Sequence, residues 1–182
     1  MGALFSLPNL LTCVRIALTP VIVLALLASN CRNAFWLSLF AGLTDAADGY
    51  LARRMGHETR IGAYLDPIAD KVLLTALYLC FGMTSLVPWW LVWLVIGRDL
   101  MILTLAGAGL LWKGIRDFPP TIWGKLSTLL QIATSLAVLS GCAYALSPTV
   151  VSSFLYATAI TTVWSGLHYA GRAAAAAKAV SS

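Results

Sequence analysis

This chain has few charged residues for its length. Of its 182 residues, 12 are Lys or Arg and 7 are Asp or Glu, whereas 60% are hydrophobic. An average soluble domain carries about 25% charged residues, so the composition excludes an ordinary soluble enzyme or binding module. Its apolar runs are instead about 20 residues long, which is the length that crosses roughly 30 Å of hydrocarbon. The composition therefore predicts an integral membrane protein.

Histidine and cysteine patterns typical of metal sites are also missing. His57 and His168 have no histidine or carboxylate partner at ligand spacing, and no CxxC motif occurs. We expect the histidines to be satisfied or solvated imidazoles, and the cysteines to be small buried hydrophobic residues. The cysteines are Cys13, Cys31, Cys80 and Cys142.

The chain contains no recognisable soluble domain, Gly/Ser-rich linker or internal repeat. Short breaks that contain Ser, Asn, Gly, Pro or paired Arg divide it into six apolar segments. We expect one all-α transmembrane domain over residues 1–182, built as a bundle of six membrane-spanning helices. The predicted spans are residues 10–28, 34–52, 61–83, 89–112, 122–146 and 150–170.

Basic residues are distributed unevenly between the two sides of this predicted bundle. With six spans, both termini and the connections after the second and fourth spans lie on one side. The basic residues on that side are Arg53, Arg54, Arg60, Lys113, Arg116, Lys125, Arg172 and Lys178. The opposite side holds Arg32 alone, so the positive-inside rule makes both termini cytoplasmic. The formal charge of +5 then reflects orientation and attraction to anionic lipid, and we expect no nucleic-acid partner.

Four aspartates fall in one stretch of the sequence, at Asp45, Asp48, Asp66 and Asp70. An unpaired charge at membrane depth costs at least about 2.5–3.5 kcal/mol, and carboxylates crowded together repel one another. Too few basic residues lie within the spans to pair with all four, so a buried network of ion pairs explains them poorly. We therefore predict that these carboxylates bind divalent cations towards the cytoplasmic ends of the second and third helices.

The spacing of the aspartates predicts how such a site is built. Asp45 and Asp48 share one face of a helix (i, i+3), as do Asp66 and Asp70 (i, i+4). If a short polar link joins two antiparallel helices, the pairs face each other across a gap suited to Mg²⁺ or Mn²⁺. A pair of such ions favours in-line displacement at phosphorus. At a lipid–water boundary, we expect a substrate with acyl tails and a phosphorylated head.

Small residues lie between the carboxylates in the sequence. Gly49, Ala52 and Gly62 would let a phosphorylated group approach the helix backbones closely. Tight packing between helices is the alternative explanation for the two glycines.

The stretch that carries the aspartates reads DAADGYLARRMGHETRIGAYLDPIAD. It resembles the signature of the CDP-alcohol phosphatidyltransferase family, D-x2-D-G-x2-A-R-x8-G-x3-D-x3-D, with every fixed position present. Flanking segments are similar to segments in the same places in bacterial members, namely LPNLLTCVRIALTP, IGRDLMIL and GKLSTLLQ. The resemblance implies an enzyme of the bacterial inner membrane that transfers the phosphatidyl group of CDP-diacylglycerol to an alcohol and releases CMP.

The resemblance also implies roles for the matching positions. Asp45, Asp48 and Asp66 would hold two divalent cations. Asp70 would touch the second cation and act as general base on the acceptor hydroxyl, a role that suits a carboxylate one turn from the metal ligands. Arg53 would contact the diphosphate of the CDP-linked lipid. The residues that would line the cytidine pocket are Gly49, Ala52 and Gly62.

Other polar residues within the spans are candidates for substrate binding, each with a structural alternative. Arg98 and Lys125 could bind the acceptor or the lipid phosphate, although an ion pair with Asp99 would give Arg98 a structural role. Asn9 and Arg15, at the cytoplasmic end of the first span, could contact the CDP-linked lipid. Helix capping and snorkelling are the alternatives for these two.

The acceptor alcohol is the open part of the functional prediction. Phosphatidylglycerophosphate synthases, which this chain resembles in length and layout, place a second Arg on the fourth span to meet the phosphate of glycerol 3-phosphate. Residues 100–112 carry no charge here. The Arg98-Asp99 pair and the HYAGR sequence at residues 168–172 are similar to CMP-forming cardiolipin synthases. Phosphatidylglycerol is therefore favoured over glycerol 3-phosphate.

Two other function classes were weighed against this enzyme. An ion-coupled transporter would also place aspartates in the membrane, but it is expected to contain an inverted repeat, which the sequence does not show. A catalytically inactive structural relative is the second alternative. The resemblance further implies membrane lipids and a second copy of the chain, in a homodimer, as partners.

Overall fold

The computed structural model describes the backbone of residues 7–55, 62–111 and 121–181, and the side chains of residues 14–44, 71–105 and 121–175. All regular secondary structure in these ranges is helical. The helices are α1 (Leu7–Leu27), α2 (Cys31–Met55), α3 (Gly62–Met83), α4 (Trp89–Leu111), α5 (Ile122–Tyr144) and α6 (Pro148–Ser181). The all-α prediction is confirmed, and each helix matches one predicted segment within a few residues, except that α6 continues to Ser181.

Two helices are long and apolar enough to cross a bilayer when only the described residues are considered. They are α5 and the Pro148–Ala175 part of α6. The described apolar parts of α1 and α3, Val14–Leu27 and Lys71–Met83, are shorter. Length and composition therefore support two of the predicted membrane spans directly, and the other four stay predictions.

A serine two residues after the last helical residue terminates both α1 and α3. Ser29 and Ser85 both adopt the left-handed conformation, each with φ of 58°. At both sites the serine amide bonds to the carbonyl three residues back, and the next amide bonds to the carbonyl five residues back. This is the Schellman arrangement, which satisfies the last carbonyls of a helix. α2 then begins at Cys31, directly after Asn30, whose Oδ1 accepts a hydrogen bond of 3.2 Å from the amide of Asn33.

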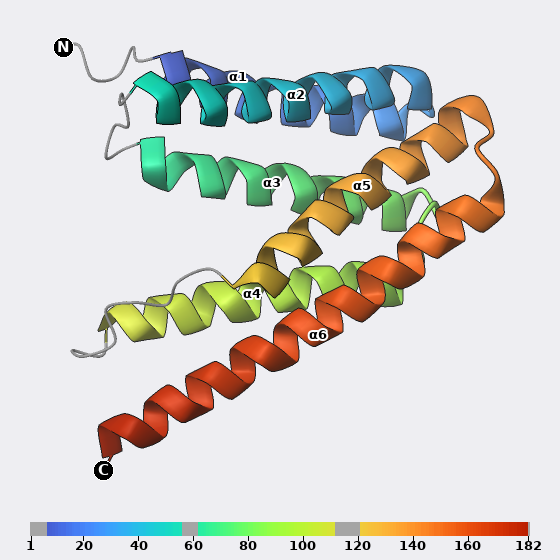
Figure 1. Cartoon of the computed structure of the whole chain (residues 1–182). Helices are drawn as coiled ribbons and strands as arrows, with labels where there is room; N and C mark the ends of the chain where they lie inside the picture. Colours follow the sequence, from blue (N-terminus) through green and yellow to red (C-terminus); the bar gives the residue numbers. More distant parts are fainter. Residues whose placement is uncertain (1–6, 56–61, 112–120, 182) are drawn as a thin grey trace.

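Figure 1 shows α1, α2 and α3 running alongside one another, with α4 and α6 below them and α5 crossing between. α1 packs against α2 and α3, while α5 packs against α2 and α6. The core contains Ile22, Leu26, Tyr78, Phe81, Leu91, Val95, Val138 and Leu139. These residues come from the last turns of α1 and α3, the first turns of α4 and the second half of α5. The core therefore lies nearer the end of the bundle at which α2, α4 and α6 begin.

α5 and α6 meet along a row of small hydroxyl side chains. The hydroxyls of Thr134 and Thr158 lie 2.6 Å apart, and those of Ser127 and Thr162 lie 3.4 Å apart. All four residues are fully buried. Small hydroxyl residues let helices approach closely and bond across their interface in a membrane, so this row stabilises the α5–α6 pair.

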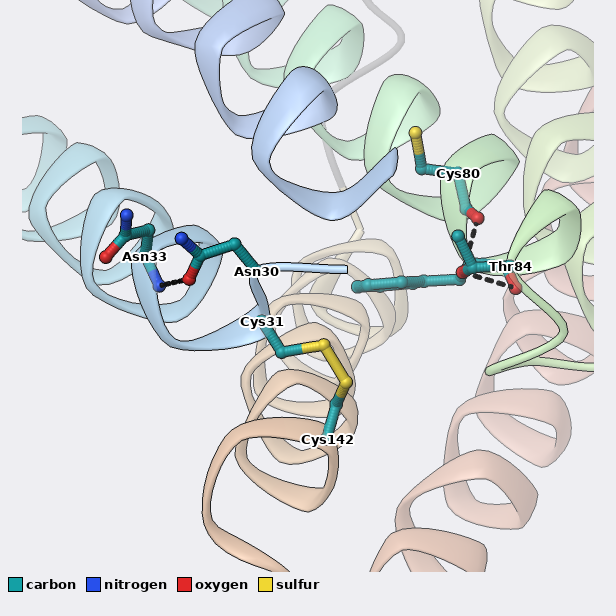
Figure 2. Close-up of a disulfide and its surroundings, with 7 residues drawn as sticks. Asn30, Cys31, Asn33, Cys80, Thr84 and Cys142 are labelled. Atoms are coloured by element: carbon teal, nitrogen blue, oxygen red, sulfur yellow. Dashed lines mark hydrogen bonds between the residues drawn. A yellow bond between two sulfur atoms is a disulfide. The ribbon is translucent and has the colours of Figure 1, made fainter. Parts of the chain in front are cut away.

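A disulfide joins Cys31, the first residue of α2, to Cys142 near the end of α5 (Figure 2). The expectation that these two cysteines are small buried hydrophobic residues is therefore wrong. Their Cα atoms are brought within 5.8 Å by packing of the start of α2 against the end of α5, where the Arg32 guanidinium also lies 5.5 Å from the Tyr144 ring centre. Cys80 is a free, buried thiol, as expected.

We expect Cys31→Ser and Cys142→Ser to lower the Tm of the purified protein equally, and the double substitution to lower it no further. The reason is that either change removes the same disulfide, and a long-range disulfide contributes about 2–4 kcal/mol to stability. Reductant should bring the wild-type Tm down to that of the variants, measured by thermal unfolding in detergent. Cys80→Ala, the matched control, should keep the full response to reductant. Alkylation of both cysteines without reductant would contradict the disulfide.

Candidate active site

The four aspartates of the predicted metal site lie on two helices, as their spacing indicates. Asp45 and Asp48 belong to the second half of α2, and Asp66 and Asp70 to the first turns of α3. Figure 1 shows the end of α2 and the start of α3 at the same end of the bundle, which we call the site end. The side chains of residues 45–70 lie outside the described ones, so the facing of the two pairs stays a prediction.

The remaining residues of the predicted nucleotide pocket belong to the same two helices. They are Gly49, Ala52 and Arg53 on α2, and Gly62 at the first position of α3. Gly62 precedes Asp66 by one helical turn, so both lie on one stripe of α3. Asn9 lies on α1, and its side chain is also outside the described ones. The roles of these residues in binding a CDP-linked lipid stay predictions.

The donor set fits hard divalent cations. Four carboxylates supply only oxygen ligands, which Mg²⁺ and Mn²⁺ prefer. Helical spacings of three and four residues place both members of each pair on one face. Among the side chains that the structure describes, no group of three or more His, Cys, Asp or Glu offers another cation site. The aspartates of α2 and α3 are therefore the candidate ligands.

A cluster of buried charges lies directly after the last of these aspartates. Lys71 follows Asp70 in the sequence, and its Nζ lies 2.6 Å from Oδ2 of Asp99 on α4. The other oxygen of that carboxylate, Oδ1, accepts a hydrogen bond of 2.7 Å from Nη1 of Arg98. The Arg98 and Asp99 side chains are 6% and 7% exposed. The Asp99 carboxylate thus contacts two basic side chains, Lys71 and Arg98. The ion pair between Arg98 and Asp99, which was the structural alternative for Arg98, is confirmed.

Arg98 is also held by two further helices. Its Nη2 donates to Oγ of Ser165 on α6 at 2.7 Å and to the carbonyl of Gly124 on α5 at 3.3 Å. Within the described part of the chain, Nε is the guanidinium nitrogen that lacks a hydrogen-bond partner. These contacts favour a structural role, and the predicted contact between Arg98 and the acceptor stays a prediction.

Sequence reasoning did not single out Lys71. The available signal was a lysine directly after the final aspartate of the signature, together with Asp99, which is the sole acidic residue of α4. Opposite charges on consecutive antiparallel helices can pair, but pairing also requires the correct register between α3 and α4. That register is a property of the packed bundle and could not be read from spacing within either helix.

The start of α5 is built against α6. Thr121 caps α5 by accepting a hydrogen bond of 3.1 Å from the amide of Gly124, and its own amide donates to the Tyr169 hydroxyl at 3.0 Å. A Cβ atom on Gly124 would lie 3.0 Å from that hydroxyl, so the close approach requires glycine. Lys125, the next residue, is exposed. Its ammonium group is accessible for the acceptor or phosphate contact predicted for it.

A cavity of about 340 Å³ lies between α1, α2, α3 and α5. Its walls are largely apolar, and they include Arg15, which is only 3% exposed. Gly42 lines the cavity one turn before Asp45 on α2. Leu74 lines it one turn after Asp70 on α3. The cavity therefore adjoins both aspartate-bearing helices, and its apolar walls and buried guanidinium suit an amphiphile with an anionic group.

Comparison with known proteins adds a family match and named relatives. A family model described as CDP-alcohol phosphatidyltransferase matches residues 5–164. A putative cardiolipin synthase of Mycobacterium tuberculosis is 36% identical over 128 residues, which cover 68% of this chain and 59% of that protein. A probable phosphatidylglycerophosphate synthase of the same species is 35% identical over 178 residues, covering 92% and 81%.

A more distant organism supplies a third relative. The CMP-forming cardiolipin synthase of Rattus norvegicus is 30% identical over 186 aligned positions, which cover 91% of this chain and 60% of that protein. The chain thus spans less than two thirds of the length of these two cardiolipin synthases.

Proposed function

This chain belongs to the CDP-alcohol phosphatidyltransferase family, and on that premise we propose that it transfers the phosphatidyl group of CDP-diacylglycerol to a glycerol-type alcohol and releases CMP. One observation carries the proposal. Every fixed position of the family signature is present, and all of them lie on two helices whose signature-bearing ends are at the same end of the bundle. Relatives that are named as phospholipid synthases support the same class of reaction.

In the proposed reaction, Asp45, Asp48 and Asp66 hold two divalent cations, Mg²⁺ or Mn²⁺, which when bound offset negative charge on the diphosphate. Asp70 accepts the proton of the acceptor hydroxyl. The alcohol oxygen bonds to the phosphorus of the phosphatidyl group, and the bond from that phosphorus to the CMP oxygen breaks, so CMP leaves with the electron pair. Arg53 binds the diphosphate. The residues proposed to line the cytidine pocket are Gly49, Ala52 and Gly62.

The cavity beside the aspartates supports a lipid substrate. Its apolar walls between α1, α2, α3 and α5 suit hydrocarbon, and the guanidinium of Arg15 at its wall suits a phosphate. We place part of the CDP-linked lipid there, with Asn9 six residues earlier on α1 closer to the aqueous boundary. This assignment gives Arg15 a ligand-binding role in place of snorkelling. Snorkelling would carry its guanidinium to the membrane–water boundary, whereas the Arg15 side chain is buried inside the bundle.

All six helices are proposed to cross the membrane. Each of the six helices exposes large apolar side chains, which fits a lipid-facing surface better than a water-facing one. They include Leu24, Trp36, Trp93, Leu129 and Ile160. A bacterial inner membrane is the proposed location, since two of the relatives named above are mycobacterial.

Both termini and the active site are proposed to face the cytoplasm. The basic residues already favour this orientation, and the disulfide supports it independently. Disulfides persist in oxidising compartments and are rare in the cytosol. Cys31 begins α2 and Cys142 lies near the end of α5, so the disulfide is at the end of the bundle opposite the aspartates. Basic residues at one end of the bundle and the disulfide at the other therefore favour the same orientation.

Phosphatidylglycerol is the proposed acceptor, with glycerol 3-phosphate as the alternative. A phosphate dianion needs an Arg or Lys fork to replace its hydration. The terminal nitrogens of Arg98 already bond to Asp99, Ser165 and Gly124, and α4 carries no later basic residue. A neutral glycerol head needs hydrogen bonds alone. Relatives named for each activity are similar to the chain, so the choice depends on this local chemistry.

We expect Asp66→Asn and Asp70→Asn each to lower the rate of CMP release by at least about 10³-fold, because the first removes a metal ligand and the second also removes the base. Higher Mg²⁺ should partly restore Asp66→Asn but not Asp70→Asn. The measurement is CMP release from CDP-diacylglycerol by the purified protein. Glu58→Gln, the matched control, changes a carboxylate of the same stretch that the signature does not fix. Wild-type rates in either aspartate variant would refute the assignment.

We expect the wild-type protein to form cardiolipin from phosphatidylglycerol and to give negligible product with glycerol 3-phosphate. Ala106→Arg, which adds a cation to α4 two turns after Arg98, should create or raise activity with glycerol 3-phosphate, since a guanidinium can replace part of a phosphate's hydration. Lipid products are separated and quantified for both acceptors. Robust phosphatidylglycerophosphate formation by the wild type, with no cardiolipin, would mean that the acceptor has been assigned wrongly.

We expect a membrane-impermeant maleimide to label Ser147→Cys in intact bacterial cells and to label Ala175→Cys only after the membrane is permeabilised. Ser147 is an exposed residue between α5 and α6 at the disulfide end, whereas Ala175 is an exposed residue of α6 towards the site end. Both changes are made in a background in which Cys13 and Cys80 are alanine. The reverse labelling pattern would place the site outside the cytoplasm.

A further inference from the structure

A series of buried polar contacts connects α5 and α6 to Lys71, the residue after Asp70. It starts at Ser165 and the Gly124 carbonyl, which both accept from Nη2 of Arg98. It continues through Nη1 of Arg98 to Asp99 and ends at Lys71, whose Nζ is 2.6 Å from the Asp99 carboxylate. No part of the chemistry proposed above uses Asp99 or Lys71.

The two carboxylate oxygens of Asp99 have different partners. Oδ1 accepts a directed hydrogen bond from Arg98, whereas Oδ2 forms an ion pair with Lys71 that lacks hydrogen-bond geometry. Arg98 is fixed in turn by α5 and α6, so Asp99 cannot turn away from Lys71 without breaking buried contacts. A buried network of paired charges and hydrogen bonds restricts the arrangements that its members can adopt.

This contact joins α3 to α4 away from the turn that connects them. Near the turn between the two helices, Trp89 packs so closely on α3 that a Cβ on Gly82 would lie 3.1 Å from its ring. Figure 1 shows α3 and α4 separating from that turn towards the site end. The long side chain of Lys71 spans this separation. The rotation of the first turns of α3 about the helix axis therefore depends on where Asp99 holds Lys71.

We propose that Asp99, acting through Lys71, is a positioning residue for Asp70. Successive helical residues are related by a fixed rotation of about 100° and a rise of about 1.5 Å, so fixing Lys71 fixes the direction in which Asp70 leaves α3. The inference rests on the proposed function in that Asp70 is taken as a metal ligand and base. It differs from the earlier hypotheses because it assigns the buried charges of α4 to the metal site rather than to the acceptor.

The test measures Mn²⁺ binding to the purified full-length protein without any lipid substrate, from the electron paramagnetic resonance signal of free Mn²⁺. Lys71→Met removes the ion pair between Lys71 and Asp99 and leaves Arg98 and Asp99 as a neutral pair, so this variant should still fold. Loss of a residue that orients a metal ligand typically weakens metal affinity about 10–100-fold. We expect a loss in that range for Lys71→Met and for Asp99→Asn. Lys71→Arg, which keeps the ion pair, should bind Mn²⁺ like the wild type.

The matched control is Thr158→Val, which removes the buried hydroxyl contact with Thr134 between α5 and α6 and does not touch α3. It should lower the Tm while leaving Mn²⁺ affinity unchanged, which separates positioning from general stability. In the activity assay at saturating Mn²⁺, Lys71→Met should lower kcat and leave KM for CDP-diacylglycerol within about threefold, since the change acts on Asp70 rather than on lipid contacts.

Several outcomes would overturn the inference. One is wild-type Mn²⁺ affinity in Lys71→Met. Another is an equal loss of affinity in Thr158→Val. A raised KM for the acceptor with Mn²⁺ binding unchanged would make Lys71 an acceptor ligand instead. Mn²⁺ binding is measured without substrate, so it tests the positioning role of Asp99 separately from the proposed reaction. The proposed reaction fails if the wild type releases no CMP with either acceptor.

Discussion

The need to compensate buried charge is the constraint on which the rest of this bundle depends. A lone charge at the centre of a membrane helix costs at least about 2.5–3.5 kcal/mol, and removing one partner of a buried pair leaves the other uncompensated. Asp99 meets this constraint by contacting Lys71 and Arg98 together. Arg98 places its remaining terminal donors on α5 and α6. Four helices, α3 to α6, are therefore tied to one another around a single carboxylate.

Different forces hold the two ends of the bundle. The end at which α2, α4 and α6 begin has the apolar core, the tight turns after Ser29 and Ser85, and the disulfide between α2 and α5. The described contacts towards the site end include directed polar ones, such as Lys71 with Asp99 and Thr121 with Tyr169. Directed contacts fix individual side chains without filling the space between helices. This division suits a site that has to admit a lipid and still hold its ligands in place.

The helices and the placement of the aspartates on them could be predicted from the sequence, because each apolar run ends in residues that stop a helix, such as Ser29-Asn30 and Pro88. The disulfide could not, since Cys31 and Cys142 are 111 residues apart and meet only when α2 packs on α5. The contact between Lys71 and Asp99 was missed for the same reason, because it depends on the register of two helices. Local periodicity predicts which face of its own helix a residue occupies, but not which residue of a neighbouring helix contacts it.

The charges that are proposed to orient the chain also bear on the proposed substrate. Four aspartates would repel a diphosphate, so cations bound to them and Arg53 have to offset that repulsion before a CDP-linked lipid can bind. The buried cluster works in the same direction, since Lys71 and Arg98 against Asp99 leave one positive charge beside the start of α3. Basic residues that favour a cytoplasmic site end would also attract anionic lipid. On the proposed function, membrane orientation, lipid attraction and charge balance at phosphorus are therefore served by the same excess of positive charge.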